Sequence, residues 1–392
     1  MFKVKRDFFY ALLIYITSVA QMPQVMFYFV IMLIGIYHFF NDSRKFTLDK
    51  PGVILIIFIV GSVVSFLLGK VFYGASFMFK DYERSTDLFP FTILLLGTIF
   101  FSKHMSFDTM RYLLYFILFE AIIAVIEYLI GIQYLIYPGD LGGETKFGET
   151  DLLYYNRVFG LSPNVSVLGL KLVVGIVFSM FLFEMNKISK AHTYLFILII
   201  LIASILSFQR TAILTVSVFF CFYFLPWLFE IKFKYKVFLI FIFVLFVLLV
   251  VSNSNEILFQ FTRGNPTDFK DIRAIVFGVY IEFISNNLIW GNYSEKIYMS
   301  FAGHSYHAHN SYLQFIATVG MPLFFVWILF FTNLIKGSNF VFILPFLFYS
   351  LAQYGIFWGC SLFDISMYSL IFLSKKESAN ASNDSRKLTV VA

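Results

Sequence analysis

Apolar runs of roughly the length that crosses a lipid bilayer recur along almost the whole chain. A transmembrane helix needs about 20 mostly apolar residues, within a range of about 17–25. By this measure we predict twelve spans, at residues 8–20, 24–40, 52–73, 89–102, 110–132, 158–183, 192–207, 211–229, 236–252, 310–332, 339–357 and 361–373. Of the 392 residues, 60% are apolar and 13% charged, whereas soluble domains are about 45–50% apolar and about 25% charged. A soluble enzyme, a disordered chain and a disulfide scaffold are excluded. The predicted fold class is all-α, a polytopic integral membrane protein with about 12 transmembrane helices.

The distribution of charge predicts which ends of the spans face the cytoplasm. If the N-terminus is cytoplasmic, the inner segments carry 18 basic and 8 acidic residues, and the outer segments carry 10 and 12. Basic residues concentrate on the cytoplasmic side of membrane proteins, so we expect both termini to be cytoplasmic. The basic stretch Met1–Arg6 before the first apolar run is expected to belong to an uncleaved signal anchor.

The spans leave three stretches on the outer face, at about 74–88, 133–157 and 253–309, and the last is by far the longest. Long loops of this kind are usually lids or binding loops. The apolar spacing within 272–289 predicts a helix that lies on the membrane surface. We therefore expect a single transmembrane domain over 1–373, followed by a short polar cytoplasmic tail, 374–392, that is disordered.

Among the charged residues within the predicted spans we single out Glu120, Glu127, Lys171 and Asp364. Each costs several kcal/mol in a bilayer unless it is paired or faces a cavity. Glu120 and Glu127 are two helical turns apart and share one face. Glu120 and Lys171 lie at similar depth on consecutive spans, which predicts a buried ion pair that locks two helices together. The alternative is an ion-coupled relay.

Arginines gather on the predicted outer face. Arg210 lies in a turn of barely four residues between two spans, Arg157 opens the sixth span, and Arg263 and Arg273 belong to the long loop. The planar guanidinium fork pairs with phosphate oxygens through two hydrogen bonds. The pattern suggests a phosphate or pyrophosphate ligand such as a lipid headgroup. The alternative is that these arginines anchor helices at the headgroup level, which we favour for Arg263.

Three of the six histidines, His304, His307 and His309, fall within six residues directly before a span. Histidine can take up and release a proton near neutral pH, so the cluster contains a candidate general base. A metal site is the weaker interpretation, because no HExxH motif or outer carboxylate cluster completes it. Asp268 and Asp271 form the only nearby acidic pair. We predict neither a metal nor a cofactor.

At these residues the chain resembles the O-antigen polymerase and O-antigen ligase superfamily, membrane glycosyltransferases of bacterial surface-polysaccharide assembly. The resemblance covers roughly residues 157–332 and the overall topology. It is carried by His309-Asn310 followed by nine residues and then Gly320, by Arg273–Tyr280 with the turn Asn286–Gly291, by the hairpin Ser207–Ala212, and by Arg157–Gly160 with Ser162–Asn164. One departure is Leu323, where the pattern usually given for ligases has glycine, threonine or tyrosine.

The resemblance implies a helical bundle of the glycosyltransferase-C type that works on the periplasmic face of the bacterial inner membrane without a nucleotide sugar. The donor would be an oligosaccharide linked to undecaprenyl pyrophosphate. In a polymerase the acceptor is a sugar hydroxyl of another lipid-linked repeat unit, and in a ligase it is the lipid A–core oligosaccharide. The expected partners are this lipid-linked oligosaccharide, the lipid bilayer and a chain-length regulator protein, with no nucleic acid.

The site residues follow from the resemblance together with the chemistry. Breaking the glycosyl–phosphate bond leaves additional negative charge on pyrophosphate, and Arg210 and Arg273 are the predicted stabilisers. His309 is the predicted base for the attacking hydroxyl. We favour a single inverting displacement, although Asp271 and Glu282 stay open as nucleophiles.

We assign substrate binding to Arg157, His307, Asn310 and Gln314. Asn310 and Gln314 are one helical turn apart, so they could instead cap or brace the start of a span. A polymerase of O-antigen or capsule repeat units is the favoured function, and the ligase is the alternative. A lipid-linked glycan transporter or flippase is the alternative of another class, because charges within spans suit a transporter.

Overall fold

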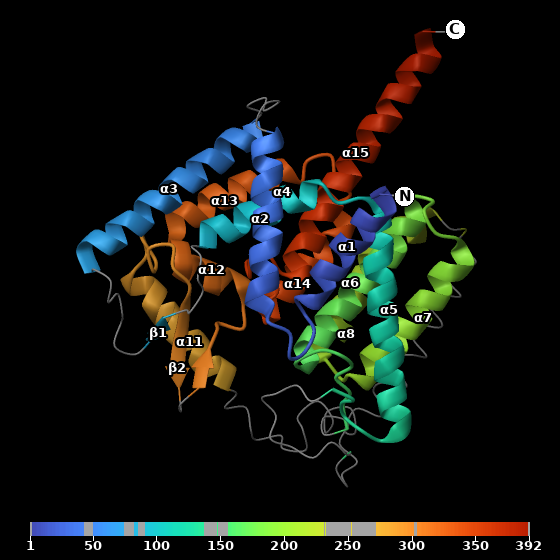
Figure 1. Ribbon diagram of the computed structural model, residues 1–392, viewed down its shortest axis with the longest axis horizontal. Coiled ribbons are helices and arrows are strands. Elements are labelled where there is room, and N and C mark those ends of the chain that lie inside the picture. The colour runs from blue at the N-terminus through green and yellow to red at the C-terminus, as the bar shows by residue number, and fades with distance from the viewer. Residues whose placement is uncertain are drawn as a thin grey trace.

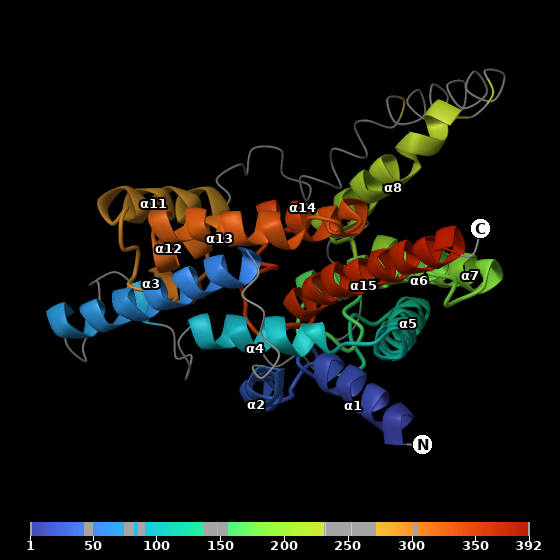
Figure 2. The ribbon, with the colours of Figure 1, turned by 90° about the horizontal axis from the view of Figure 1, so that it is seen from above.

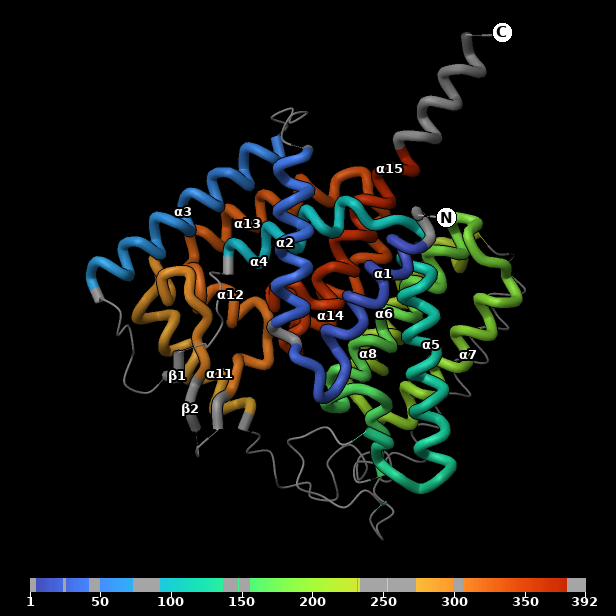
Figure 3. The backbone as a smooth tube through the Cα atoms, in the orientation of Figure 1, coloured from blue at the N-terminus to red at the C-terminus, as the bar shows by residue number. Residues whose placement is uncertain are grey.

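The computed structural model describes residues 2–42, 50–73, 82–84, 91–136, 147, 156–230, 232, 252, 272–301 and 304–390. Figure 3 traces the backbone from the N-terminus to the C-terminus. The elements in Figure 1 are α1 (Phe2–Ile16), α2 (Gln24–Asp42), α3 (Lys50–Tyr73), β1 (Tyr82–Arg84), α4 (Phe91–Lys103), α5 (Phe107–Ile130), α6 (Val165–Glu184), α7 (Lys190–Leu206), α8 (Arg210–Glu230), α11 (Ile272–Asn286), β2 (Ile297–Phe301), β3 (His304–Tyr306), α12 (Ser311–Val319), α13 (Met321–Leu334), the 3₁₀ turn η2 (Phe340–Phe342), α14 (Leu344–Ala352) and α15 (Leu362–Val390).

The helical class and the membrane character are confirmed, whereas the number of spans stays a prediction. Four helices in the described part of the chain are long and apolar enough to cross a membrane, namely Lys50–Phe72, Phe107–Ile130, Val165–Glu184 and Arg210–Glu230. Several shorter apolar helices coincide with other predicted spans. The predicted span 236–252 lies, apart from residue 252, outside the described residues.

Two predicted spans are interrupted. The run 310–332 divides into α12 and α13 at Gly320, whose backbone has φ 79° and ψ 165° and cannot continue a helix. The run 339–357 contains only η2 and α14, and the chain leaves the helix at Gln353. Apolar composition predicted the length of each run, but it carries no information about such local breaks.

A small antiparallel sheet, which the all-α prediction does not contain, joins two of the predicted outer loops. Its strand order is β1-β2-β3, with Glu83 paired to Tyr298 and Ser300 paired to Ser305. Helix α11 confirms the helix predicted within 272–289, whereas its position on the membrane surface stays a prediction. In Figure 1 the sheet and α11 lie towards the lower left, whereas the N and C ends of the chain lie in the upper part.

The tail is helical where the composition predicted disorder. Helix α15 continues without interruption from Leu362 to Val390. Extending a helix that already exists adds one hydrogen bond per residue without a new nucleation cost, so the apolar first half of α15 can support a polar continuation.

Two glycines allow α2 and α4 to pack closely. Helix α4 lies between α2 and α15, as Figure 2 shows. At the crossing of α2 with α4, a Cβ atom on Gly35 would overlap the carbonyl oxygen of Gly97. Helix association in lipid depends on this kind of van der Waals contact, because lipid tails are as apolar as the side chains themselves.

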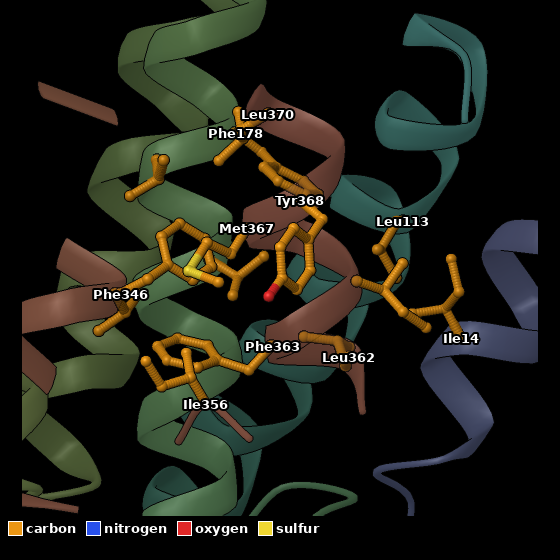
Figure 4. Close-up of a cluster of buried hydrophobic side chains, with 14 of the residues drawn as sticks. Ile14, Leu113, Phe178, Phe346, Ile356, Leu362, Phe363, Met367, Tyr368 and Leu370 are labelled. Carbon is orange, nitrogen blue, oxygen red and sulfur yellow. The ribbon is translucent and has the colours of Figure 1, made fainter. Parts of the chain in front are cut away.

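The first turns of α15 form the centre of the main hydrophobic cluster. Figure 4 shows Tyr368 of α15 between Phe178 of α6 and Leu113 of α5, and Phe363 below it on the side of Phe346 and Ile356. All of these side chains are buried, including Phe346 of α14. This packing fixes the segment between α14 and α15, which lines the candidate site described below.

The four ionisable residues singled out inside the predicted spans all have polar partners in the structure. Lys171 Nζ lies 2.8 Å and 3.0 Å from the two carboxylate oxygens of Glu120, and both side chains are buried. Tyr15 and Ser162 also donate their hydroxyls to Glu120. The predicted ion pair is confirmed, and it joins α1, α5 and α6.

The two remaining carboxylates hold loops by accepting backbone hydrogen bonds. Glu127 accepts from the backbone N–H groups of Leu135, Phe159 and Gly160. Asp364, in the first turn of α15, accepts from three consecutive N–H groups in Phe357–Gly359 and from the Ser361 hydroxyl. Buried carboxylates are stable when several donors surround them.

Candidate functional site

Three of the predicted arginines line one pocket. Arg157, Arg210 and Arg273 come from the segment before α6, the first residue of α8 and the second residue of α11, and together they border a cavity of about 530 Å³. We call it the arginine pocket. No aspartate or glutamate occurs among the described residues that line it. Its charge suits an anion.

The turn between α7 and α8 positions two of these arginines. Phe208 adopts a left-handed conformation with φ 46°, which reverses the chain directly before Arg210. The backbone N–H of Val158 donates to the carbonyl of Leu206 over 3.3 Å, so the segment carrying Arg157 is attached to the same turn. Left-handed backbone at a large side chain is strained and recurs at functional sites.

Three helix N-termini contribute to the arginine pocket, a feature that the sequence-based assignment missed. Val165 and Ser166 open α6, Arg210 and Thr211 open α8, and Arg273 lies in the first turn of α11. Helix N-termini carry partial positive charge and bind anions. An arginine there is unfavourable in isolation, so its placement suggests an anionic ligand. The N-cap Asn164 is the sequence signal that could have indicated one of these starts.

One side of the arginine pocket is apolar and open. Ile213, Leu214, Phe348 and Leu351 line it, and Leu214 and Leu351 are each more than half exposed. An apolar exposed rim beside a cationic pocket suits a ligand that combines a hydrocarbon chain with a charged head.

His307 and His309 line an adjoining cavity of about 430 Å³, which we call the histidine pocket. Ser166 borders both pockets. Its carbonyl accepts the Tyr349 hydroxyl over 2.8 Å, and its hydroxyl accepts the Gln209 amide over 3.0 Å. The two pockets therefore share Ser166, which is hydrogen-bonded to one lining residue of each.

His307 is held as a neutral ring. Its Nδ1 accepts the backbone N–H of His309 over 3.1 Å, which places the proton of the neutral imidazole on Nε2. Burial lowers the pKa of His307 to about 3, and His309 and the Arg273 guanidinium act in the same direction. Arg273, which lines the arginine pocket, is thus near enough to act electrostatically on a histidine of the adjoining pocket. His309 itself has φ 49°, a second strained position in the site.

The low pKa of His307 predicts a pH-dependent stability. In the unfolded chain histidine titrates near 6.5, whereas folded His307 stays neutral to about 3. Below pH 6.5 the unfolded state binds a proton that the folded state does not. The free energy of unfolding therefore decreases as the pH is lowered through this window. We expect the melting temperature to drop between pH 7.5 and 5 and His307→Gln to show a smaller drop, measured by thermal denaturation in nanodiscs. Equal drops for the two proteins would contradict this assignment.

Asn310 and Gln314 brace the histidine segment, as their spacing suggested. The Asn310 side chain caps α12 and donates to the carbonyl of Leu351. The Gln314 amide accepts from Ala308 N–H over 2.9 Å and donates to the carbonyl of Ile297 over 2.6 Å. Gln314 is completely buried. Their predicted contact with substrate remains a prediction, and these hydrogen bonds favour a positioning role.

Two motif glycines meet across the loop that follows α11. A Cβ on Gly320 would overlap the carbonyl oxygen of Ile289, and one on Gly291 would lie 2.5 Å from the nitrogen of Gly320. The N–H of Asn292 donates to the carbonyl of Ala317 over 2.7 Å at the same place. No larger residue fits, and the contact fixes α11 relative to α12. It thereby fixes Arg273 relative to His309.

The family model described as O-antigen ligase matches residues 195–328. This match confirms the resemblance to the O-antigen polymerase and ligase superfamily. Neither a curated protein nor a solved structure matches the chain significantly. The matched range of the superfamily model contains both arginines assigned to catalysis and the whole histidine segment, whereas Arg157 lies outside it. Among the described residues, no group of three histidine, cysteine or acidic side chains is arranged to hold a metal ion.

One segment that lines the histidine pocket was not predicted from the sequence. Residues 353–361 connect α14 to α15 and contribute Gln353, Tyr354 and Trp358 to the histidine pocket. Their mostly apolar composition predicts part of a transmembrane span instead. The signal that could have revealed them is the pair of glycines, Gly355 and Gly359, which interrupts this run.

Proposed function

We propose that the protein is a polymerase of O-antigen or capsule repeat units. It transfers a glycan from undecaprenyl pyrophosphate to a sugar hydroxyl of another lipid-linked repeat unit. The reaction takes place on the periplasmic face of a bacterial inner membrane, which the chain crosses about twelve times with both termini in the cytoplasm. A chain-length regulator protein is a candidate partner. The observation that carries the proposal is the grouping of Arg157, Arg210 and Arg273 in one pocket next to His309.

The arginine pocket has the chemistry that the donor requires. During transfer the bond between the anomeric carbon and the phosphate oxygen breaks, and pyrophosphate gains negative charge. Arg210 and Arg273, supported by the N-termini of α8 and α11, stabilise this charge, and Arg157 binds the same group. The apolar rim at Leu214 and Leu351 receives the polyprenyl chain from the bilayer.

His309 acts as the base for the acceptor hydroxyl. As the hydroxyl oxygen bonds to the anomeric carbon, its proton moves to His309, and the configuration inverts in a single displacement. His307 is the poorer base because a ring with a pKa of about 3 has little affinity for a proton. It binds substrate instead, with its Nε2–H as a hydrogen-bond donor.

Leu323 supports the polymerase over the ligase, since the usual ligase pattern has glycine, threonine or tyrosine at this place. The ligase is the second candidate, because both enzymes use the same donor and the same motifs. A flippase is supported less, because its main sequence argument was charge inside the spans, and Glu120 and Lys171 neutralise each other.

The test is the gel profile of surface polysaccharide from a deletion strain complemented with wild type, Arg210→Ala, Arg273→Ala or His309→Ala, at equal membrane abundance. We expect the deletion strain and all three variants to show core capped by a single repeat unit, and wild type to restore the ladder. Bare core with polymer retained on the lipid carrier would indicate a ligase. Lipid-linked single units that face the cytoplasm would indicate a flippase. Full ladders from all three variants would exclude the mechanism.

A further inference from the structure

We propose that the histidine pocket binds the acceptor sugar, and that the segment Gln353–Ser361 is the platform on which this sugar lies. The inference rests on the proposed function only in identifying this sugar as the acceptor of the transfer. The binding of an uncharged glycan in this pocket is argued from its own residues.

The two pockets differ sharply in charge. The arginine pocket contains three guanidinium groups, whereas no arginine, lysine, aspartate or glutamate occurs among the described residues that line the histidine pocket. One of its two histidines, His307, is neutral at physiological pH. A pocket lined by hydroxyl, amide and aromatic side chains without formal charge suits a polyol rather than a phosphate.

An aromatic wall runs along one side of the histidine pocket. The His307 ring lies 4.3 Å from that of His309 and 5.3 Å from that of Tyr354, measured between centroids. The Tyr354 ring is 4.4 Å from that of Trp358 and nearly perpendicular to it. Trp358 is half-buried and borders the cavity. The C–H groups of a sugar ring pack favourably against aromatic faces of this kind.

Gln353 provides a hydrogen-bond donor that the described residues do not use. It lines the histidine pocket and is only 5% exposed, and its Nε2 has no hydrogen-bond partner among the residues that the structure describes. A buried amide donor without a partner lowers the stability of the folded protein by roughly 1–3 kcal/mol. A ligand hydroxyl in the pocket would accept this hydrogen bond.

Two hydroxyls among the lining residues complement this donor. Thr17 and Ser18 already donate their hydrogens to the carbonyls of Ile14 and Tyr15, over 2.6 Å and 2.7 Å. Their oxygens can therefore accept hydrogen bonds from a ligand. A sugar hydroxyl both donates and accepts, so Gln353 with Thr17 and Ser18 matches its needs.

The platform is rigid although it contains no regular structure. Asp364 binds its backbone at residues 357–359, and the Ser311 hydroxyl accepts the N–H groups of Gly355 and Ile356. Lys296 donates to the carbonyl of Trp358 over 2.8 Å, and its Nζ lies 5.2 Å from the Trp358 ring centroid. This bracing fixes the indole next to the histidines before any ligand arrives, which lowers the entropic cost of binding.

The test compares two probes on the full-length protein in nanodiscs. One is the free repeat-unit oligosaccharide of the host polysaccharide, released from its lipid by mild acid, and the other is inorganic pyrophosphate. Gln353→Leu should weaken oligosaccharide binding about tenfold, because it removes the donor, and leave pyrophosphate binding unchanged. Its melting temperature should not fall, because the unpaired buried amide is gone. Trp358→Phe keeps a ring and should weaken the oligosaccharide several-fold.

Arg210→Ala should weaken pyrophosphate binding and leave oligosaccharide binding unchanged. Trp227 is an exposed tryptophan of α8 that lines neither pocket, so Trp227→Phe should change neither affinity. The inference is overturned if Gln353→Leu and Trp358→Phe both bind the oligosaccharide as wild type does, or if wild type binds only pyrophosphate. Loss of oligosaccharide binding in Arg210→Ala alone would also overturn it. Failure of the proposed function is a separate result, because the polysaccharide of the deletion strain would then be unchanged while these affinities still shift.

Discussion

Replacing Arg210 with lysine should slow polysaccharide formation about a hundredfold, although the positive charge is retained. Arg210 is the first residue of α8, and the turn Ser207–Gln209 holds it in the arginine pocket. A guanidinium forms two parallel hydrogen bonds with a phosphate, whereas an ammonium offers only a point charge. In Arg210→Ala, which loses the charge as well, the rate of polysaccharide formation should be lower by a further factor of about ten to a hundred.

The measurement is the initial rate of chain extension by purified protein supplied with lipid-linked repeat units. Arg111→Lys is the matched control, because Arg111 forms a partly exposed pair with Asp108 at 2.8 Å and lines neither pocket. Such pairs contribute little, so this variant should work at the wild-type rate. A wild-type rate for Arg210→Lys would mean that charge alone, not geometry, carries the contribution of this residue.

The helical class and the approximate positions of the helices were predictable because each span must be apolar over about 20 residues. The breaks were not predictable from apolarity. Gly320 ends α12 because it meets Ile289, a residue more than thirty positions away in the chain, and no local pattern records that contact. The pairing of β1 with β2 likewise depends on contacts between two distant loops.

The candidate site was predictable in its charged part and not in its neutral part. Arg210, Arg273 and His309 stand out in an apolar chain, so their chemistry was visible in the sequence. Gln353 and Trp358 lie in a run that reads as one more span, and only the folded backbone turns them towards the histidines. The positioning of Gln314 was indicated by spacing, but its partner Ile297 belongs to a strand that was not expected.

Breaking the Glu120–Lys171 pair should strongly destabilise the protein. Both side chains are at most 1% exposed, and the carboxylate joins α5 and α6 to α1 through Tyr15. Lys171→Met leaves a buried carboxylate without its cation, and Glu120→Gln leaves a buried ammonium without its anion. Each should lower the free energy of unfolding by about 3–5 kcal/mol.

The double variant Glu120→Gln with Lys171→Met separates two quantities. One is the penalty for leaving a single buried charge unpaired, and the other is the net contribution of the ion pair to the free energy of unfolding. The double variant leaves no uncompensated charge. Tyr15 and Ser162 donate to different oxygens of the carboxylate, so the amide oxygen can accept from one hydroxyl while the amide NH2 donates to the oxygen of the other. The destabilisation of the double variant should therefore be well below the sum of the two single values. The measurement is equilibrium unfolding in mixed micelles, with the exposed Lys190→Met as control, expected within about 0.5 kcal/mol of wild type.

The same double variant decides between a structural pair and the ion-coupled relay. A structural pair can be replaced by neutral groups without loss of the reaction, because neither side chain lines the arginine pocket or the histidine pocket. We therefore expect the double variant to restore the polysaccharide ladder in the deletion strain, whereas the single variants fail through low abundance. A double variant that folds and reaches the membrane at wild-type levels, yet makes no ladder, would favour the relay. In that case Glu120 and Lys171 would take part in ion transfer, and their ion pair would not be only structural.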